Sequence, residues 1–302
     1  MAHKPVLLKE VLELLNLRPG ITAVDATLGG GGHAVEIMKQ ISPAGHLIGL
    51  DQDPQALERS RPRFDPASCR VDLVHENFRN LPKALSRLNI PGVDAVLLDI
   101  GFSSDQLEDS QRGFSFDREG PLDMRMNPDS ETTAADLVNG LPEKELADLI
   151  YTYGEEHRSR RIARVLCERR QTARFETTQD LAGTLENLHG GPVRKKSVKR
   201  HFPGKRHPAT RVFQALRIAV NDELEALREG LEGSWSCLNR GGRLGVISFH
   251  SLEDRIVKRT FLRWKAEGAG TVVTKKPVTP DEAELNENPR ARSAKLRVME
   301  KS

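Results

Sequence analysis

Apolar residues recur with two different periods along the first hundred positions of the chain. Compact apolar runs predict strands at Ile21–Thr27, His46–Asp51, Arg70–His75 and Val93–Asp99, and the segments between them have apolar residues at helical spacing. The run that ends at Asp99 is apolar almost throughout, which is typical of a parallel strand buried on both faces. Strands that alternate with helices predict an α/β fold with a mostly parallel sheet.

This alternation stops after Asp99 and resumes roughly one hundred residues later, a gap of ordinary domain size. Helical spacing without a convincing strand is found at Pro142–Tyr153, His157–Arg170 and Thr178–Leu188. A long amphipathic helix over Ala209–Leu238 then follows. We therefore expect the first part of a sheet domain over residues 1–106, an inserted helical domain over 107–209, and the second part of the sheet domain over 210–302.

The final segment predicts the remaining elements of the sheet domain. Arg243–Phe249 is another apolar strand, and Ser251–Lys265 has helical spacing. Short alternating runs at Thr271–Thr274 and Lys295–Met299 predict an antiparallel pair that closes the sheet. The polar segment between them, Lys275–Arg292, predicts a surface loop.

A glycine-rich turn follows the first predicted strand and is the strongest chemical signal in the sequence. Gly29, Gly31 and Ala34 fit the G-x-G-x-x-A spacing, in which glycines permit a sharp turn and let a nucleotide approach the backbone. Asp51 ends the second strand about 20 residues further on, where a carboxylate can accept hydrogen bonds from both ribose hydroxyls. The combination favours a nucleotide pocket over an ordinary glycine-rich turn.

Acidic residues at the strand ends indicate which ligand this pocket would take. The carboxyl ends of parallel strands converge on one crevice, so Asp25, Asp51 and Asp99 should lie together, and we expect no Lys or Arg beside them. Three carboxylates would repel a pyrophosphate and attract a cationic sulfonium, which favours S-adenosylmethionine over NAD. Phe78 would pack on the adenine of this ligand, or else be a core residue.

Composition limits the possible classes of protein. The 302 residues carry a net charge of +3, and they include neither an apolar run long enough to span a bilayer nor a signal-peptide pattern. Cys69, Cys167 and Cys237 are far apart and form no C-x-x-C pair, so we expect neither a disulfide framework nor a metal site. A reducing cytoplasm fits this cysteine usage.

Positive charge is concentrated between Arg194 and Arg211, where eight Lys and Arg residues follow one another without an acid. Such a local field suits the phosphates of RNA, and RNA contact is favoured there over a merely solvated surface. A second group of arginines is mixed with glutamates along the helix predicted from His157, and there the two interpretations are equally open. Its members are Arg158, Arg160, Arg161 and Arg164.

Long motifs in order along nearly the whole chain resemble those of a known family. They include Gly29–His33, Asp99–Gln106, Gly120–Met126, Tyr153–Glu156, His207–Arg211, Phe213–Ile218 and Gly241–Lys258. The chain resembles the bacterial 16S rRNA (cytosine(1402)-N(4))-methyltransferases, the RsmH or MraW family. Phe102 and Asp105 depart from the family pattern, in which Val and Pro are expected.

The resemblance implies a class I, Rossmann-like methyltransferase core interrupted by a helical domain that recognises the substrate. It implies a cytoplasmic enzyme that uses S-adenosylmethionine to methylate the N4 amine of cytosine 1402 in 16S rRNA of the small ribosomal subunit. Cofactor contacts are implied at seven positions: Gly31, Gly32, His33, Asp51, Phe78, Asp99 and Gln106.

Methyl transfer to this amine needs groups that orient it and draw its hydrogens. Asp99 and the loop Ser103–Ser104 are candidates because they follow a strand at the mouth of the pocket. His250 is either a proton acceptor or part of a structural hydrogen bond. Two other functions remain open: a ribosome-assembly protein with an inactive pocket, and a nicotinamide-dependent dehydrogenase. The sequence leaves the oligomeric state open.

Overall fold

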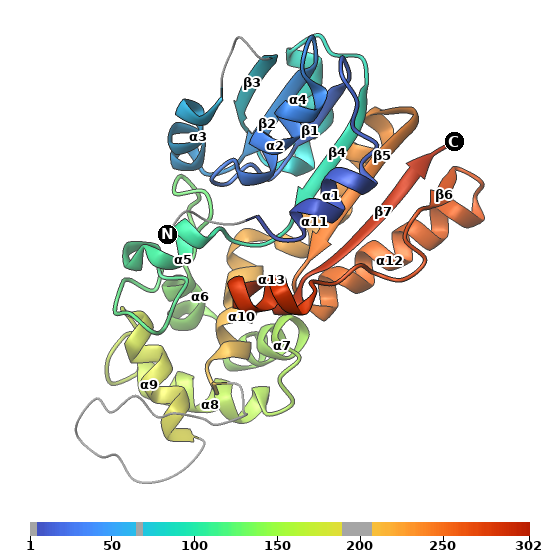
Figure 1. Cartoon of the computed structure of the whole chain (residues 1–302). Coiled ribbons are helices and arrows are strands. Elements are labelled where there is room, and N and C mark those ends of the chain that lie inside the picture. Colours follow the sequence, from blue (N-terminus) through green and yellow to red (C-terminus); the bar gives the residue numbers. More distant parts are fainter. Residues whose placement is uncertain (1–4, 65–68, 189–206) are drawn as a thin grey trace. The chain divides into compact units, whose positions relative to one another are not determined.

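A seven-stranded sheet organises the protein, whose computed structural model describes residues 5–64, 69–188 and 207–302. Within these ranges the strand order is β3-β2-β1-β4-β5-β7-β6 (Figure 1). The strands are β1 (Thr22–Asp25), β2 (His46–Asp51), β3 (Arg70–His75), β4 (Val93–Asp99), β5 (Leu238–Ser248), β6 (Gly270–Val272) and β7 (Lys295–Lys301). Neighbouring strands are parallel except where β7 pairs with β5 and β6. This sheet confirms the α/β, class I methyltransferase fold expected from the sequence.

Helices cover both faces of the sheet, which explains why the central strands are apolar throughout. Successive residues of a strand point to opposite faces, so Leu47 and Leu97 pack in one core cluster while Ile48 and Leu98 pack in the other. Side chains of α1 and α2 belong to the first cluster, and those of α4, α11 and α12 to the second. These helices are α1 (Leu8–Leu14), α2 (Gly32–Ile41), α4 (Leu81–Arg87), α11 (Glu223–Cys237) and α12 (Ser251–Ala266), and α3 spans Pro54–Ser60.

The chain divides into two compact units. The first unit contains the sheet and consists of residues 1–103 and 224–302, and the second is the continuous segment Ser104–Glu223. The second unit is helical, apart from one isolated bridge between Pro121 and Thr177 among its described residues. Its helices are α5 (Ser104–Glu108), α6 (Ala134–Gly140), α7 (Glu143–Gly154), α8 (Ser159–Arg170), α9 (Thr178–Leu188) and α10 (Thr210–Asn221).

The long helix expected over Ala209–Leu238 is wrong, because the chain breaks at Asp222. This residue has a φ of 48°, in the left-handed region, and it separates α10 from α11. The first half packs on α7, where a Cβ atom on Gly154 would lie only 2.6 Å from the carbonyl oxygen of Arg211. Since α10 packs in this way, the helical unit extends to Glu223 rather than ending at residue 209.

In the sheet domain, the structure differs from the sequence-based prediction at two places. The strand expected at Arg243–Phe249 starts earlier, at Leu238, because Leu238 pairs with Val93 across an irregularity in the β4–β5 register. The polar segment after β6 is not wholly a loop. It contains α13 (Glu282–Glu287) and a short 3-10 helix whose Ala291 is buried in the core cluster of α1 and α2.

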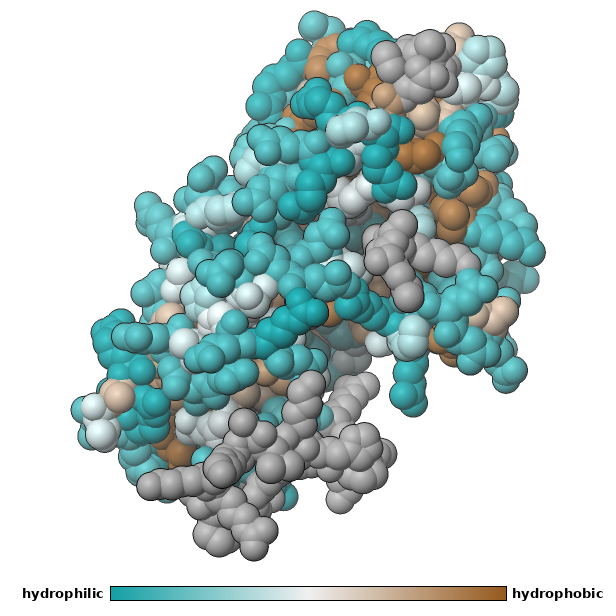
Figure 2. All heavy atoms as spheres, turned by 60° about the vertical axis from the view of Figure 1, so that its left-hand side comes forward, coloured by the Kyte–Doolittle hydropathy of each residue, from teal (hydrophilic) through white to brown (hydrophobic). Residues whose placement is uncertain are grey.

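The surface is mainly polar on the face drawn in Figure 2. Among the described residues, Tyr151 and Leu262 are the large hydrophobic side chains that stand exposed, at 53% and 50%. In the same part of the chain, none of the helices combines the length and the apolar character that a membrane crossing requires.

Candidate functional site

The glycine turn after β1 has a backbone that demands glycine at several positions. Gly29 and Gly31 have φ values of 50° and 73°, and the amide of Gly31 donates to the carbonyl oxygen of Leu28 over 2.7 Å. A Cβ atom on Gly32 would come within 2.6 Å of the Pro5 ring. The turn therefore brings the N-terminus of α2 directly to the carboxyl end of β1.

Asp51, at the end of β2, is tied to this turn. One carboxylate oxygen accepts a hydrogen bond from the amide of Gly29 over 2.7 Å, and the other accepts from the amide of Asp53 over 2.8 Å. Burial raises the pKa of Asp51 to about 6. Each oxygen has a second lone pair, so the carboxylate can still accept from the two hydroxyls of a ribose, as the sequence predicts.

Asp25 and Asp99 end β1 and β4, which pair with each other in the sheet, and Asp25 is buried while the Asp99 side chain is 20% exposed. Burial raises the pKa of Asp25 to about 7, with a smaller contribution from the charge of Asp51. Burial also raises the pKa of Asp99 to about 8, and the charges of Asp25 and Glu253 raise it further. A bound cation would favour the ionised form of each group, so the site suits a positively charged ligand.

The two oxygens of Asp99 have different surroundings. Oδ1 is buried and has no hydrogen-bond partner among the described residues, whereas Oδ2 lies 3.6 Å from Nδ1 of His33. A buried, unpartnered carboxylate oxygen is costly unless a ligand supplies a donor. The amino group of S-adenosylmethionine is such a donor, and this observation therefore fits the expected cofactor.

His33 is held by the backbone of the N-terminal segment. Its Nε2 lies 2.9 Å from the carbonyl oxygen of Val6, which can only accept, so Nε2 carries a proton. In the neutral ring, Nδ1 then presents its lone pair toward Asp99. Thr27 provides a second connection, because its hydroxyl oxygen accepts from the Asp99 amide over 2.7 Å. The ends of β1, α2 and β4 are thereby fixed relative to one another.

Phe78 follows β3 and makes the core contacts that the sequence leaves open for it. Its ring packs on α11, where a Cβ atom on Gly230 would lie 2.3 Å from a ring carbon, and it borders the core cluster of α4 and α11 while remaining only partly buried. The preceding residue, Asn77, donates to the side-chain oxygen of Gln52 over 2.8 Å. This bond ties the Phe78 loop to the segment that follows Asp51.

The first unit therefore brings together six of the seven implied cofactor residues along one edge of the sheet: Gly31, Gly32, His33, Asp51, Phe78 and Asp99. The seventh, Gln106, is a buried residue of α5 in the second unit. Ser103, at the end of the first unit, lies against the glycine turn, since a Cβ atom on Gly29 would be 3.8 Å from the Cβ atom of Ser103.

The expectation of a site without cations is wrong. The Arg63 guanidinium donates to the carbonyl oxygen of Gly30, and the charge of Arg59 lowers the pKa of Asp51, against the larger effect of burial. Both arginines belong to the segment after Pro54, one helical turn apart. The strand-and-turn pattern does not predict that these two side chains point toward the glycine turn. They lie beyond the end of β2, on α3 and on the 3-10 helix that follows it.

Glu253 is a buried acid that the sequence pattern did not indicate, and its contacts account for the structural role of His250. Glu253 accepts from the amides of Phe249 and His250 over 2.8 and 3.1 Å, and its own amide lies 3.4 Å from Nδ1 of His250. These contacts form the N-terminal cap of α12. The structural interpretation of His250 therefore holds. The spacing of His250 and Glu253, three residues apart before an apolar helix, was a signal for the cap.

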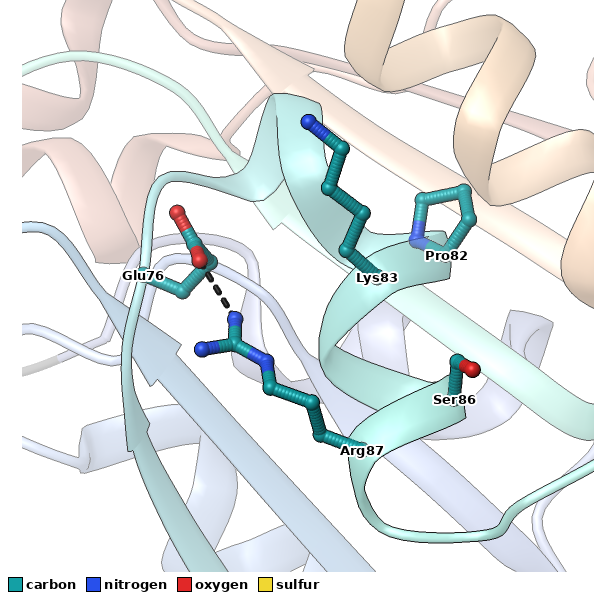
Figure 3. Close-up of a pocket in the computed structure, with 5 residues that line it drawn as sticks. All are labelled: Glu76, Pro82, Lys83, Ser86 and Arg87. Atoms are coloured by element: carbon teal, nitrogen blue, oxygen red, sulfur yellow. Dashed lines mark hydrogen bonds and ion pairs between the residues drawn. The ribbon is translucent and has the colours of Figure 1, made fainter.

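An open depression of about 540 Å³ lies next to the Phe78 loop and is lined by Glu76, Pro82, Lys83, Ser86 and Arg87. Figure 3 shows the ion pair between Glu76 and Arg87 on one side of it. Hydrogen bonds and the charge of Arg87 lower the pKa of Glu76, although burial opposes this shift. None of the implied cofactor residues lines this depression, so we distinguish it from the acidic edge of the sheet.

The basic segment expected to contact RNA is only partly described. Its residues up to Arg206 lie outside the described ranges. Arg211, at the end of the segment, is on α10 and pairs with Glu156, with 3.3 Å between Nη1 and the carboxylate oxygen.

Comparison with known proteins gives one family and several relatives. A family model described as the MraW methylase family matches residues 1–302. A protein named Ribosomal RNA small subunit methyltransferase H, from Carboxydothermus hydrogenoformans, is 47% identical, with 99% of this chain and 98% of the relative covered. A protein of the same name from Syntrophobacter fumaroxidans is 46% identical, with coverage of 100% and 97%.

Solved structures give more distant likenesses. An rRNA methylase from Streptococcus thermophilus is 12% identical, with a TM-score of 0.44 over 100% of this chain and 98% of that one. TrmN from Thermus thermophilus is 13% identical, with a TM-score of 0.46 over 98% of this chain and 48% of that one. At these scores, the solved structures add nothing to the family match.

Proposed function

Because the chain belongs to the MraW methylase family, we propose that it methylates the N4 amine of a cytosine, cytosine 1402 of 16S rRNA in the small ribosomal subunit. Family membership confirms both the resemblance found in the sequence and the expected cofactor, S-adenosylmethionine. Relatives at 46–47% identity are named as small-subunit rRNA methyltransferases, which supports the choice of RNA. The observation that carries the proposal is the acidic edge formed by Asp25, which is buried, and by Asp51 and Asp99, which are partly buried.

The ribose, the adenine and the α-amino group of the cofactor each have a partner of suitable chemistry on this edge. Asp51 would accept from the ribose hydroxyls, and Phe78 would pack against the adenine. Asp99 would take the α-amino group on Oδ1, and Gly31 and Gly32 would let the ligand approach the backbone. His33 would orient Asp99, and Gln106 is the seventh residue that the family resemblance implies. When bound, the sulfonium supplies an electrophilic methyl group.

The protein's contribution to the transfer is orientation and charge. The lone pair of the cytosine amine is delocalised into the ring, so the nitrogen must be held in line with the methyl group at near-attack distance. As the bond to carbon forms, positive charge grows on this nitrogen, and a nearby carboxylate stabilises it. We assign this role to Asp99, which in its ionised form can also accept the released proton.

RNA recognition falls to the helical unit in this proposal, together with the basic residues between Arg194 and Arg211. The target base must leave any helical stack to reach a pocket at the sheet edge. We further propose that the protein works in the cytoplasm, where the small subunit is assembled.

A transfer assay tests the function directly. Purified protein is incubated with labelled S-adenosylmethionine and small subunits from cells that lack this gene, and the rRNA is then digested for mass spectrometry. We expect one N4-methylcytidine to appear, and we expect Asp99→Asn to abolish it. Cofactor binding without label in the RNA would instead support an assembly protein with an inactive pocket.

A thermal-shift comparison separates the dehydrogenase alternative. S-adenosylhomocysteine should raise the melting temperature and NADH should not, because only a ligand that binds the native state stabilises it. Asp51→Asn should reduce the shift given by S-adenosylhomocysteine. Protection by NADH alone would refute the methyltransferase assignment.

A further inference from the structure

The corner between α7 and α8 presents an aromatic ring to solvent. Tyr151, in the last turn of α7, is 53% exposed. Its ring meets that of His157 edge-on, with 6.2 Å between the ring centroids. His157 is also exposed and stands just before the first turn of α8. Among the described residues, Tyr151 is the large aromatic side chain that stands exposed.

The aromatic pair lies at the start of a strongly basic segment. His157–Arg164 contains four arginines and no acid. Arg164 pairs with Glu143 at 3.7 Å, which fits the solvated-surface interpretation for that residue. Arg158, Arg160 and Arg161 are exposed, and within the described ranges none of their guanidinium groups forms an ion pair. The structure thus separates one structural arginine from three that are available to a partner.

Acidic residues near the corner do not cancel this charge. Glu156 is only 13% exposed and is already engaged by Arg211 and by the backbone amide of Arg158. Glu155 ends α7 in a left-handed conformation, with a φ of 49°. Asp148 is exposed one helical turn before Tyr151. The arginines therefore dominate the α8 side of the corner, and the field there favours an anionic partner.

We propose that the α7–α8 corner, defined as Tyr151, His157, Arg158, Arg160 and Arg161, binds a single-stranded segment of the RNA substrate. This proposal rests on the proposed function. Exposed aromatic rings beside a cationic surface form the usual platform for single strands, because every base offers a π-face and every nucleotide a phosphate. A duplex does not expose its base faces, so the corner should distinguish a single strand from a helix.

Binding of a labelled RNA to the full chain, measured by fluorescence anisotropy, tests the platform. The probes are an unstructured single strand of about 12 nucleotides and a duplex of the same length. We expect Tyr151→Ala to weaken binding of the single strand by about 5- to 150-fold, the range of one lost stacking contact. Tyr151→Phe should bind as the wild type does, and neither change should affect the duplex.

A charge-removal pair tests the arginines against a matched control. R160Q/R161Q should weaken binding and should lower the slope of log K against log salt by about 1.4, as expected for two lost phosphate contacts on a single strand. K258Q/R259Q removes the same charge from two adjacent exposed residues of α12. The control should leave both the affinity and the slope unchanged.

The outcomes are decisive when methyl transfer to small subunits is measured on the same proteins. If the wild type transfers methyl groups while Tyr151→Ala and R160Q/R161Q bind RNA as the wild type does, the corner is not an RNA site. An equal loss in K258Q/R259Q, or an equal loss of duplex binding in Tyr151→Ala, also overturns the proposal. If RNA binding depends on the corner but no methyl group is transferred, the corner stands and the proposed reaction fails.

Discussion

Gly230→Ala should weaken cofactor binding without contacting the cofactor. Gly230 lies on α11, and an added Cβ atom would be 2.3 and 2.6 Å from two carbons of the Phe78 ring. Real Cβ contacts are essentially never shorter than 3.0 Å, so the ring must move. Gly233, three residues further along α11, is also close to this region, since the Pro82 ring would be 3.0 Å from an added Cβ atom. The loop that carries Phe78 is therefore seated on α11 and has little room to adjust.

The magnitude follows from two opposing effects on stability and one on binding. Overpacking costs about 1–3 kcal/mol, whereas replacing a helical glycine by alanine stabilises by up to about 1 kcal/mol. We expect a net loss of about 0–3 kcal/mol in the free energy of unfolding, so the protein stays folded. A displaced Phe78 loses much of its stacking on adenine, which is worth about 1–3 kcal/mol. The Kd for S-adenosylhomocysteine should rise about tenfold.

Calorimetric titration of S-adenosylhomocysteine measures the binding effect, and urea unfolding measures the stability. Gly183→Ala on α9 is the matched control, because nothing lies within 4 Å of an added Cβ atom there. It should raise the free energy of unfolding by about 0.5–1 kcal/mol and leave the Kd unchanged. If Gly230→Ala binds the ligand as tightly as the wild type does, then the position of Phe78 does not matter and the reasoning fails.

Two further predictions concern buried charges. Asp25 and Asp99 have pKa values raised from 3.8 to about 7 and about 8, so their contribution to stability is full below about pH 4 and is lost as the pH rises through 7 and 8. The free energy of unfolding without ligand should fall by about 7 kcal/mol between pH 5 and 9 in urea titrations, since Asp25 contributes over about two pH units and Asp99 over about three, at about 1.4 kcal/mol per unit. A fall equally steep in Asp99→Asn would contradict this. Arg217 and Glu223 form a bidentate pair with 12% and 6% exposed side chains, and Arg217→Ala should cost about 3–5 kcal/mol. Arg228→Ala, which breaks an exposed pair with Glu225, should cost less than about 1 kcal/mol, and similar losses for the two variants would show that burial is not the cause.

The strands could be predicted from the sequence because their apolar runs must be buried on both faces. β2, β3 and β4 have the predicted bounds, and β1 lies within the predicted run. The glycine turn and the place of Asp51 at the end of β2 could be predicted for a related reason, since a tight turn and the end of a strand are both determined by nearby residues. Where the chemistry sits at the end of a strand, the sequence is informative.

Features that depend on contacts between distant segments could not be predicted in this way. The break at Asp222 interrupts a continuous amphipathic pattern, because α10 and α11 bury their apolar faces in different units. In the sequence, Gly230 is an ordinary glycine in a helix. Only the folded structure shows that the Phe78 ring, from the segment between β3 and α4, packs directly against it. Arg63 turns back to Gly30 across 33 residues of chain, and no periodicity indicates such a return.

The position of the insertion has a consequence for the order of assembly on the ribosome. Residues 104–223 are synthesised after β4 and before its neighbour β5. Until β5 is made, the partial sheet β3-β2-β1-β4 has β4 as an unpaired edge strand. At about 5–20 residues per second the synthesis of residues 104–223 takes roughly 6–24 seconds. Val96 and Leu98, which β5 and its helices later cover, are exposed to solvent or to a chaperone during that time. A nascent chain stalled before Leu238 should therefore be a strong chaperone substrate, and one extended past the end of β7 should not.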